Sequence, residues 1–127
     1  MLATFRDYLK TLDLADNYYI GKIDNTKLKT IGIYSQPGMR RIEAIGKASS
    51  YDVAGIRILV HWNKNARETE EAARNIFESI RYITDADISE EIHVNYLDLI
   101  EPEPNFIGTD DNGVYEYHIS ARIYYRR

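Results

Sequence analysis

The sequence predicts an α+β domain in which an antiparallel sheet packs against an amphipathic helix, with a second helix at the N-terminus. Three observations lead to this prediction. Residues 51–62 and 115–125 alternate as long strands do, and residues 66–81 between them carry apolar side chains at helical spacing. A chain of 127 residues can bury about two thirds of its unfolded surface in one core, so we expect a single domain over residues 1–127.

The first dozen residues predict an amphipathic helix with one buried stripe. The apolar side chains of this stripe recur at helical spacing: Leu2, Phe5, Leu9 and Leu12. Charged side chains occupy the positions between them: Arg6, Asp7, Lys10 and Asp13. The stripe needs a partner surface, which the predicted sheet supplies.

Two short strands are predicted next, over Asn17–Asp24 and Thr30–Tyr34, joined by a polar connection. Gln36 then leads into Pro37 and Gly38. Proline presets the backbone at the second position of a turn and glycine accepts a positive φ at the third, so a type II turn is favoured. This turn is either an exposed tip that touches a neighbour or a plain connection.

The clearest pattern is the strand from Tyr51 to Trp62. Its first face is apolar throughout: Ala54, Ile56, Ile58, Val60 and Trp62. Its second face is mixed: Val53, Arg57, Leu59 and His61. A mixed face suits partial cover by a helix or by another subunit. Arg57 is accordingly either an ion-pair donor at an interface or a surface residue whose stem lies along the sheet.

A helix is predicted to begin near Ala66, because Asn65 followed three residues later by Glu68 forms an Asn version of the capping box. Its apolar face is interrupted by Thr69 and consists of Ala66, Ala73, Ile76, Phe77 and Ile80. Glutamates precede arginines by three or four residues on the opposite face. This face is therefore either a solvated, salt-bridged surface or a subunit contact.

The C-terminal part predicts a hairpin with a long loop. Ile92–Ile100 alternates loosely as a strand, Pro102 and Pro104 end it, and the turn Thr109–Gly113 leads into the long final strand Tyr115–Tyr125. The preceding acidic segment is expected to form solvated turns, with the carboxylates Asp85, Asp87, Glu90 and Glu91.

The residue content argues against several function classes. The absence of cysteine excludes disulfides, a cysteine nucleophile and thiolate metal sites, and the formal charge of −4 disfavours free nucleic-acid binding. The three histidines are expected to be surface or half-buried residues, since their separations match no sequential metal-ligand signature: His61, His93 and His118. No apolar run suits a signal peptide or a membrane span. We therefore expect no catalytic, cofactor or metal site and no membrane contact.

Eleven tyrosines exceed what an ordinary core needs and favour an assembly surface, although strand propensity alone also explains each one. The tyrosines of greatest interest as interface residues are Tyr18, Tyr19, Tyr115, Tyr117, Tyr124 and Tyr125. Further candidates are Pro37 and Gly38 at the turn, Arg40 and Arg41 as a basic rim, and Arg57 on the long strand.

The segment Ile31–Ile80 resembles the minor capsid and tail terminator proteins of long-tailed bacteriophages. The resemblance rests on a short strand ending in Gly32-Ile33-Tyr34, the Pro37-Gly38 element, a long strand and one amphipathic helix. It implies a homo-oligomeric ring, usually a hexamer, on the head-proximal end of the tail tube. Such a ring stops tube polymerisation and joins the tail to the head connector or stopper proteins, while DNA passes through its lumen without specific binding.

The resemblance also implies a location in the virion, and in the bacterial host cytoplasm during assembly. The segments expected to contact tube or connector are Asp24–Lys29, Gln36–Ser50 and Glu101–Gly113. A head-closure or other minor capsid protein fits the same pattern. An alternative of another class, a small-molecule-binding or hydrolytic α+β domain, requires a polar pocket that converges on the histidines.

Overall fold

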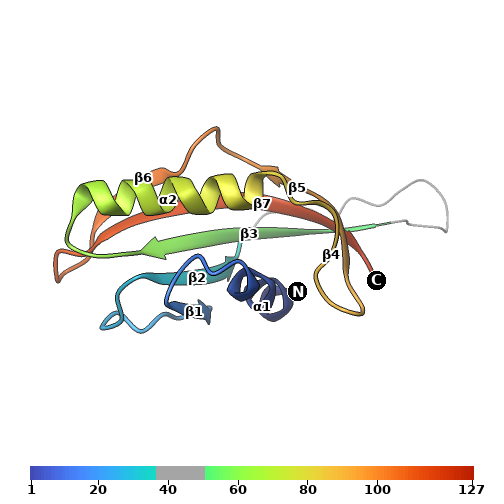
Figure 1. Cartoon of the computed structure of the whole chain (residues 1–127), viewed down its shortest axis with the longest axis horizontal. Coiled ribbons are helices and arrows are strands. Elements are labelled where there is room, and N and C mark those ends of the chain that lie inside the picture. The colour runs from blue at the N-terminus through green and yellow to red at the C-terminus, as the bar shows by residue number, and fades with distance from the viewer. Residues whose placement is uncertain (37–50) are drawn as a thin grey trace.

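A computed structural model describes residues 1–36 and 51–127, which form two helices and a seven-stranded sheet (Figure 1). The elements are α1 (Leu2–Thr11), β1 (Asn17–Ile20), β2 (Thr30–Ser35), β3 (Asp52–His61), α2 (Ala66–Arg81), β4 (Thr84–Asp87), β5 (His93–Leu99), β6 (Asn105–Thr109) and β7 (Tyr115–Arg126). The strand order is β1-β2-β3-β7-β5-β4, and β6 pairs with the other part of β7. Within the described ranges, the strands pair antiparallel except β1 with β2. The predicted α+β class is confirmed.

The sheet is centred on β3 and β7, which pair over ten residues from Asp52 opposite Tyr125 to His61 opposite Glu116. Their alternation confirms the predicted faces. One face of β3 is fully buried at Ile56, Ile58 and Val60, and Ala54 and Trp62 pack against the same core at its ends. The strongly apolar face of each strand is thus the one that a second layer covers.

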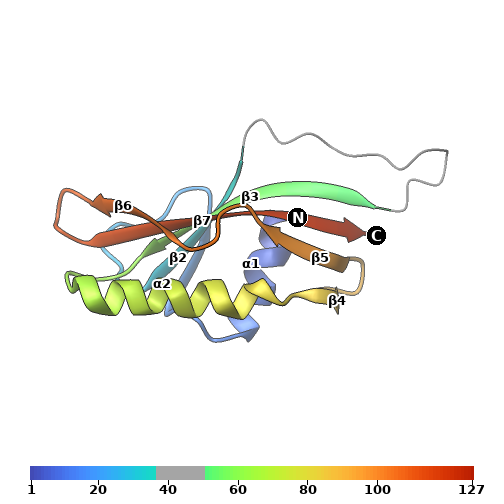
Figure 2. The same ribbon diagram turned by 90° about the horizontal axis from the view of Figure 1, so that it is seen from above.

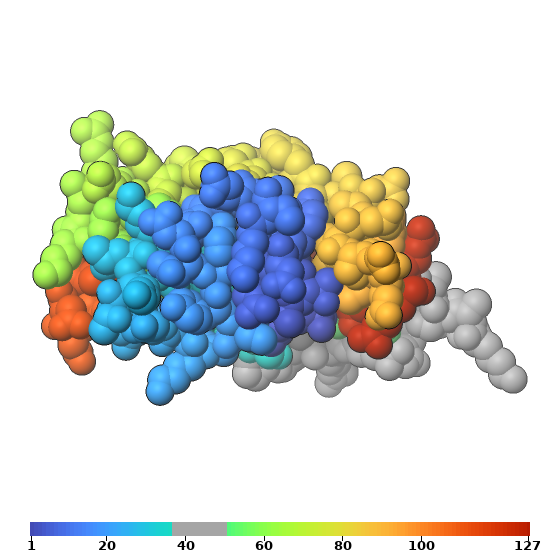
Figure 3. All heavy atoms as spheres, turned by 60° about the horizontal axis from the view of Figure 1, so that its bottom comes forward, coloured from blue at the N-terminus to red at the C-terminus, as the bar shows by residue number. Residues whose placement is uncertain are grey.

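Both helices cover that one face of the sheet (Figure 2). In α2 the buried positions are Thr69, Ala73, Ile76, Phe77 and Ile80, and in α1 they are Phe5 and Leu9. The space-filling view shows α1 lying between the β1–β2 region and the β4–β5 region (Figure 3). The helices and the sheet therefore share a single hydrophobic core.

The helix α2 begins at Ala66, as predicted, because its first turn is well capped. The Asn65 side chain accepts a hydrogen bond from the Glu68 backbone N–H at 3.1 Å. Asn63 extends the cap, since its Oδ1 accepts from the Asn65 N–H at 3.0 Å and its Nδ2 donates to the Glu68 carboxylate at 3.1 Å. Thr69, the polar interruption of the apolar face, donates to the Asn65 carbonyl at 2.9 Å and so is buried without an unpaired hydroxyl.

Two strands were absent from the sequence prediction. The acidic segment after α2 was expected to form turns, but Thr84–Asp87 is the edge strand β4, paired with β5. The predicted long loop before the final strand contains β6, which pairs with β7 on the side opposite β3. The predicted antiparallel pairing of residues 92–100 with the last strand is confirmed as β5 with β7.

The strand β5 contains a bulge between Val94 and Tyr96, which explains its loose alternation. Val94 and Leu97 both face the helices and are buried, whereas Tyr96 faces the other way. Val94 and Tyr96 therefore lie on opposite faces although they are two residues apart in the strand. The first short strand also ends earlier than predicted, at Ile20, where Gly21 takes a φ of +73°.

Gly32 marks the point where the β1–β2 connection folds over the sheet. A Cβ atom at Gly32 would lie 2.5 Å from Cγ2 of Ile23, which is buried against the face opposite the helices. Only a residue without a side chain therefore fits at this position of β2. Ile23 therefore covers one end of the sheet face on which no described helix packs.

We predict that Asn65→Ala lowers the free energy of unfolding by about 1 kcal/mol, because the Glu68 N–H loses its acceptor. Urea denaturation measures the change. Asn75→Ala is the matched control, since Asn75 is exposed in the middle of α2 and should leave stability unchanged or slightly higher. Equal stability of the two variants would contradict the capping role.

We predict that Gly32→Ala lowers the free energy of unfolding by about 1–3 kcal/mol, because the new methyl group overlaps Ile23. The same substitution in an Ile23→Ala background should cost much less, since the overlapping atom is gone. Denaturation of the four chains forms a double-mutant cycle. Additive costs would show that Ile23 is not the cause.

Candidate assembly surface

The sheet face opposite the helices is the candidate functional surface, and we call it the open face. It carries Tyr34 of β2, Arg57 and Leu59 of β3, and Ser120 and His118 of β7, as the strand register requires. No helix lies on this face among residues 1–36 and 51–127 (Figure 2). The described helices thus leave the open face without a second layer.

A groove of about 440 Å³ lies on the open face, beside the part that Ile23 covers. Its lining comes from the four strands β2, β3, β6 and β7 and from the residue after β2: Tyr34, Ser35, Gln36, Arg57, Leu59, Ile107 and His118. Arg57 is exposed and forms no ion pair within the described part of the chain, and Ile107 is 47% exposed. The groove therefore combines an apolar wall with a positive charge that has no ion-pair partner among the described residues.

His118 adds an unsatisfied donor to this groove. Its Nε2 lies 2.9 Å from the Asn105 amide nitrogen, which donates to it, so the neutral ring carries its proton on Nδ1. Nδ1 is buried and has no hydrogen-bond partner in the described residues. Burial lowers the pKa of His118, the nearby Arg57 charge lowers it further, and Glu101 acts in the opposite direction. Gln36 Oε1, in the same groove, is a second buried atom without a partner.

His61 is fully buried on the open face, so the expectation of a surface or half-buried histidine is wrong at this position. Its Nδ1 lies 2.8 Å from Glu116 Oε2 and its Nε2 lies 3.2 Å from the Asn25 carbonyl oxygen. The β1–β2 connection that carries Asn25 covers the ring. His61 therefore ties β3, β7 and this connection together, which is a structural role.

His93 lies between two carboxylates at the sheet edge. Its Nδ1 is 2.7 Å from Asp87 Oδ1 and its Nε2 is 2.7 Å from Asp85 Oδ1. Asp85 adopts a φ of +50°, unusual for a residue with a side chain. Both aspartate side chains remain at least 80% exposed. Together with Glu90 and Glu91 they form an acidic tip at the β4–β5 hairpin.

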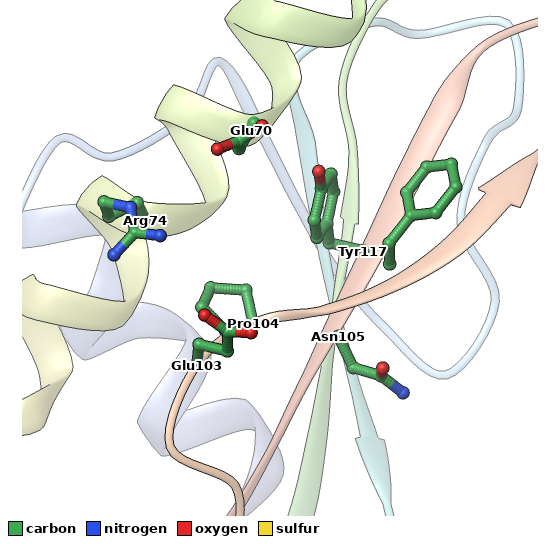
Figure 4. A pocket seen from close by; sticks show the side chains of 7 residues that line it. Glu70, Arg74, Glu103, Pro104, Asn105 and Tyr117 are labelled. Carbon is green, nitrogen blue, oxygen red and sulfur yellow. The ribbon is translucent and has the colours of Figure 1, made fainter.

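A second cleft, of about 340 Å³, lies between α2 and β6 (Figure 4). Glu70 and Arg74 project from the helix, and Glu103, Pro104 and Tyr117 lie across from them. Burial raises the pKa of Tyr117, as does the Glu70 charge, while Arg74 partly opposes them. The cleft holds charges of both signs close together, so it offers no single-sign attraction for a ligand.

The predicted interface tyrosines fall into different environments. Tyr124 and Tyr125 are buried, and Tyr125 is part of the core, so packing within the chain accounts for it. The hydroxyl of Tyr18 accepts hydrogen bonds from the N–H groups of Leu14 and Ala15 at 2.7 and 2.8 Å. The remaining candidates are half-buried: Tyr19, Tyr115 and Tyr117. Their contribution to an interface stays a prediction.

Four of the predicted interface residues lie outside the described residues: Pro37, Gly38, Arg40 and Arg41. Sequence reasoning missed Tyr96, which is 47% exposed and stacks on Tyr124 with ring centroids 4.4 Å apart. It also missed Ile107 and His118 as neighbours of Arg57. The place of His118 follows from the pairing of the two long strands, which sets it opposite Leu59.

A metal site in residues 1–36 and 51–127 requires several acidic or histidine side chains to lie close together. No group of three or more potential ligands among His, Cys, Asp and Glu could hold a metal ion in the part of the chain described here. Each histidine is engaged by different neighbours: Glu116 for His61, Asp85 and Asp87 for His93, and Asn105 for His118. In the described helices, no segment is long and apolar enough to cross a membrane.

Comparison with protein families settles the class. The sequence matches the family described as bacteriophage tail terminator protein over residues 8–127. The chain belongs to the bacteriophage tail terminator family. No match was found among curated proteins. The resemblance seen in the sequence is thus confirmed, and this tail terminator protein is a structural component of a bacteriophage whose expected neighbours are other tail and head proteins.

We predict that acidification destabilises the wild type more than a His118→Gln variant. The lowered pKa of His118 means that the unfolded chain takes up a proton first as the pH falls below the ordinary value of 6.5. Stability linked to this histidine is fully present above that pH and is lost below it. Urea denaturation at several pH values between about 7 and 5 measures the difference. Parallel curves for the two chains would exclude this role of His118.

Proposed function

We propose that the protein forms a closed ring, with six copies as the family resemblance implies, at the head-proximal end of the phage tail tube. There it stops tube polymerisation and joins the tail to the head connector. The observation that carries the proposal is the family match over residues 8–127. The uncovered sheet face supports it, because a subunit of an assembly needs a surface that its own core does not use.

The exposed apolar side chains support an assembly role as well. Four of them lie in β5, in β6 or directly after β5: Tyr96, Ile100, Phe106 and Ile107. Phe106 makes ring contacts with Tyr115 and Tyr117 at centroid distances of 6.2 and 5.2 Å, so its position is fixed although it is 53% exposed. Fixed exposed aromatic side chains bind a partner at low cost in conformational entropy. These residues are candidates for contact with the tube, the connector or a neighbouring copy.

Passage of DNA through such a ring requires no specific site. The chain carries 20 acidic and 16 basic residues, so a ring of copies is acidic overall. An acidic or neutral lumen does not hold the phosphate backbone by counterion release. On this proposal DNA passes through without being retained, and the basic side chains serve protein contacts.

We predict that light scattering over a wide concentration range gives a discrete mass several times that of the 14.8 kDa chain, near six copies. Electron microscopy of phage assembled without this protein should show tail tubes of variable and excessive length. Complementation with the wild-type chain should restore uniform tails. Uniform, head-joined tails in its absence would refute the terminator role, whatever the mass in solution.

A further inference from the structure

The groove on the open face and the acidic tip of the same chain have complementary charges. The groove presents Arg57 without a carboxylate partner in the described residues, together with the buried Nδ1–H of His118. The acidic tip presents Asp85 and Asp87, whose side chains are 86% and 80% exposed. These two surfaces belong to different parts of the sheet, β3 with β7 and the β4 edge.

Self-association of this chain has an electrostatic constraint. Two copies with a formal charge of −4 repel each other, so a self-contact that sets a positive surface against a negative one is favoured. Two arginines of β7 also lie on this face. Arg122 lies 3.9 Å from Asp98 in an ion pair. Arg126 is paired with His93 in the strand register, beside the acidic tip itself. Among these three arginines, Arg57 is the one that lines the groove.

The acidic tip is also accessible to another chain. The strand β4 is the last strand of the sheet on its side, so its outer backbone groups and side chains are accessible. Asp85 and Asp87 are exposed on this strand, whereas the neighbouring Ile83 and Ile88 pack against the core of their own chain. The groove has an apolar wall from Leu59 and Ile107.

We propose that the groove around Arg57 and His118 receives the acidic tip of a second copy, with Asp85 or Asp87 placed against the Arg57 guanidinium. Each copy then gives its tip to one neighbour and its groove to the other. Such a head-to-tail contact uses two different surfaces and closes into a ring when the rotation between copies permits. The inference rests on the proposed self-assembly and names the surfaces that carry it.

Charge reversal tests the contact. Arg57→Glu alone, or Asp85→Lys with Asp87→Lys, should raise the concentration needed for assembly at least about tenfold, as measured by light scattering. The triple variant should recover assembly, because the charges are exchanged and not removed. Arg67→Glu is the matched control, since this arginine is 90% exposed on α2 and should leave assembly unchanged. Circular dichroism and thermal unfolding confirm that each variant folds.

Cysteine cross-linking gives a second readout, because the chain has no cysteine of its own. A Thr84→Cys, Ile107→Cys chain should form an oxidant-dependent ladder of covalent multimers, whereas each single variant should give at most a dimer. Asn75→Cys combined with Ile107→Cys is the control pair. Cross-linking traps brief contacts, so it reports on the surfaces even where the free chain is mainly monomeric.

The outcomes separate the two proposals. If the wild type assembles, and charge reversal changes neither the assembled mass nor the cross-linking of the Thr84→Cys, Ile107→Cys chain, the Arg57 contact is overturned and the ring stands. If the Arg57→Glu chain assembles normally but no longer attaches to tails, the groove receives an acidic segment of a tail or head protein instead, which also overturns it. If the wild type is monomeric in solution but the Thr84→Cys, Ile107→Cys chain gives a specific ladder, the contact is supported while the free ring fails.

Discussion

The pairing of β3 with β7 is the constraint on which the rest of the structure depends. Ten consecutive residue pairs fix which side chains of both strands point to each face. A shift of one residue would turn Ile56, Ile58 and Val60 out of the core and bring Arg57 and His118 into it. The register therefore defines the core and, by the same alternation, the composition of the open face. The helices, the bulged β5 and the groove all follow from this pair.

The sequence predicted those parts of the fold whose signal is long or local. The alternation of β3 and β7 and the cap of α2 needed only neighbouring residues. The strands β4 and β6 were not predicted, because their four and five residues are largely exposed and show no apolar pattern. These strands depend instead on pairing with β5 and β7. Burial of His61 was also invisible, since its cover comes from Asn25, 36 positions away.

The sequence predicted that a candidate assembly surface exists but not which residues form it. Tyrosine number pointed to an interface, but Tyr18 serves a local backbone site and Tyr125 fills the core. Composition counts side chains without saying where tertiary structure places them. Arg57 was recognised as ambiguous because its strand face is mixed. Its neighbours Ile107 and His118 lie 50 and more residues away, so only the fold could show that an apolar wall and an unsatisfied donor stand beside it.

The asymmetry of the sheet gives a physical reason for the assembly that we propose for this family member. The chain covers one face with two helices and leaves most of the other without a second layer among its described residues. Hydrophobic burial alone does not select a partner for that face, because apolar contact is non-directional. Charges do select one, since an unpaired guanidinium accepts a carboxylate and rejects another cation. In an acidic chain with an acidic tip, local charge therefore favours one arrangement of copies over many equally apolar ones.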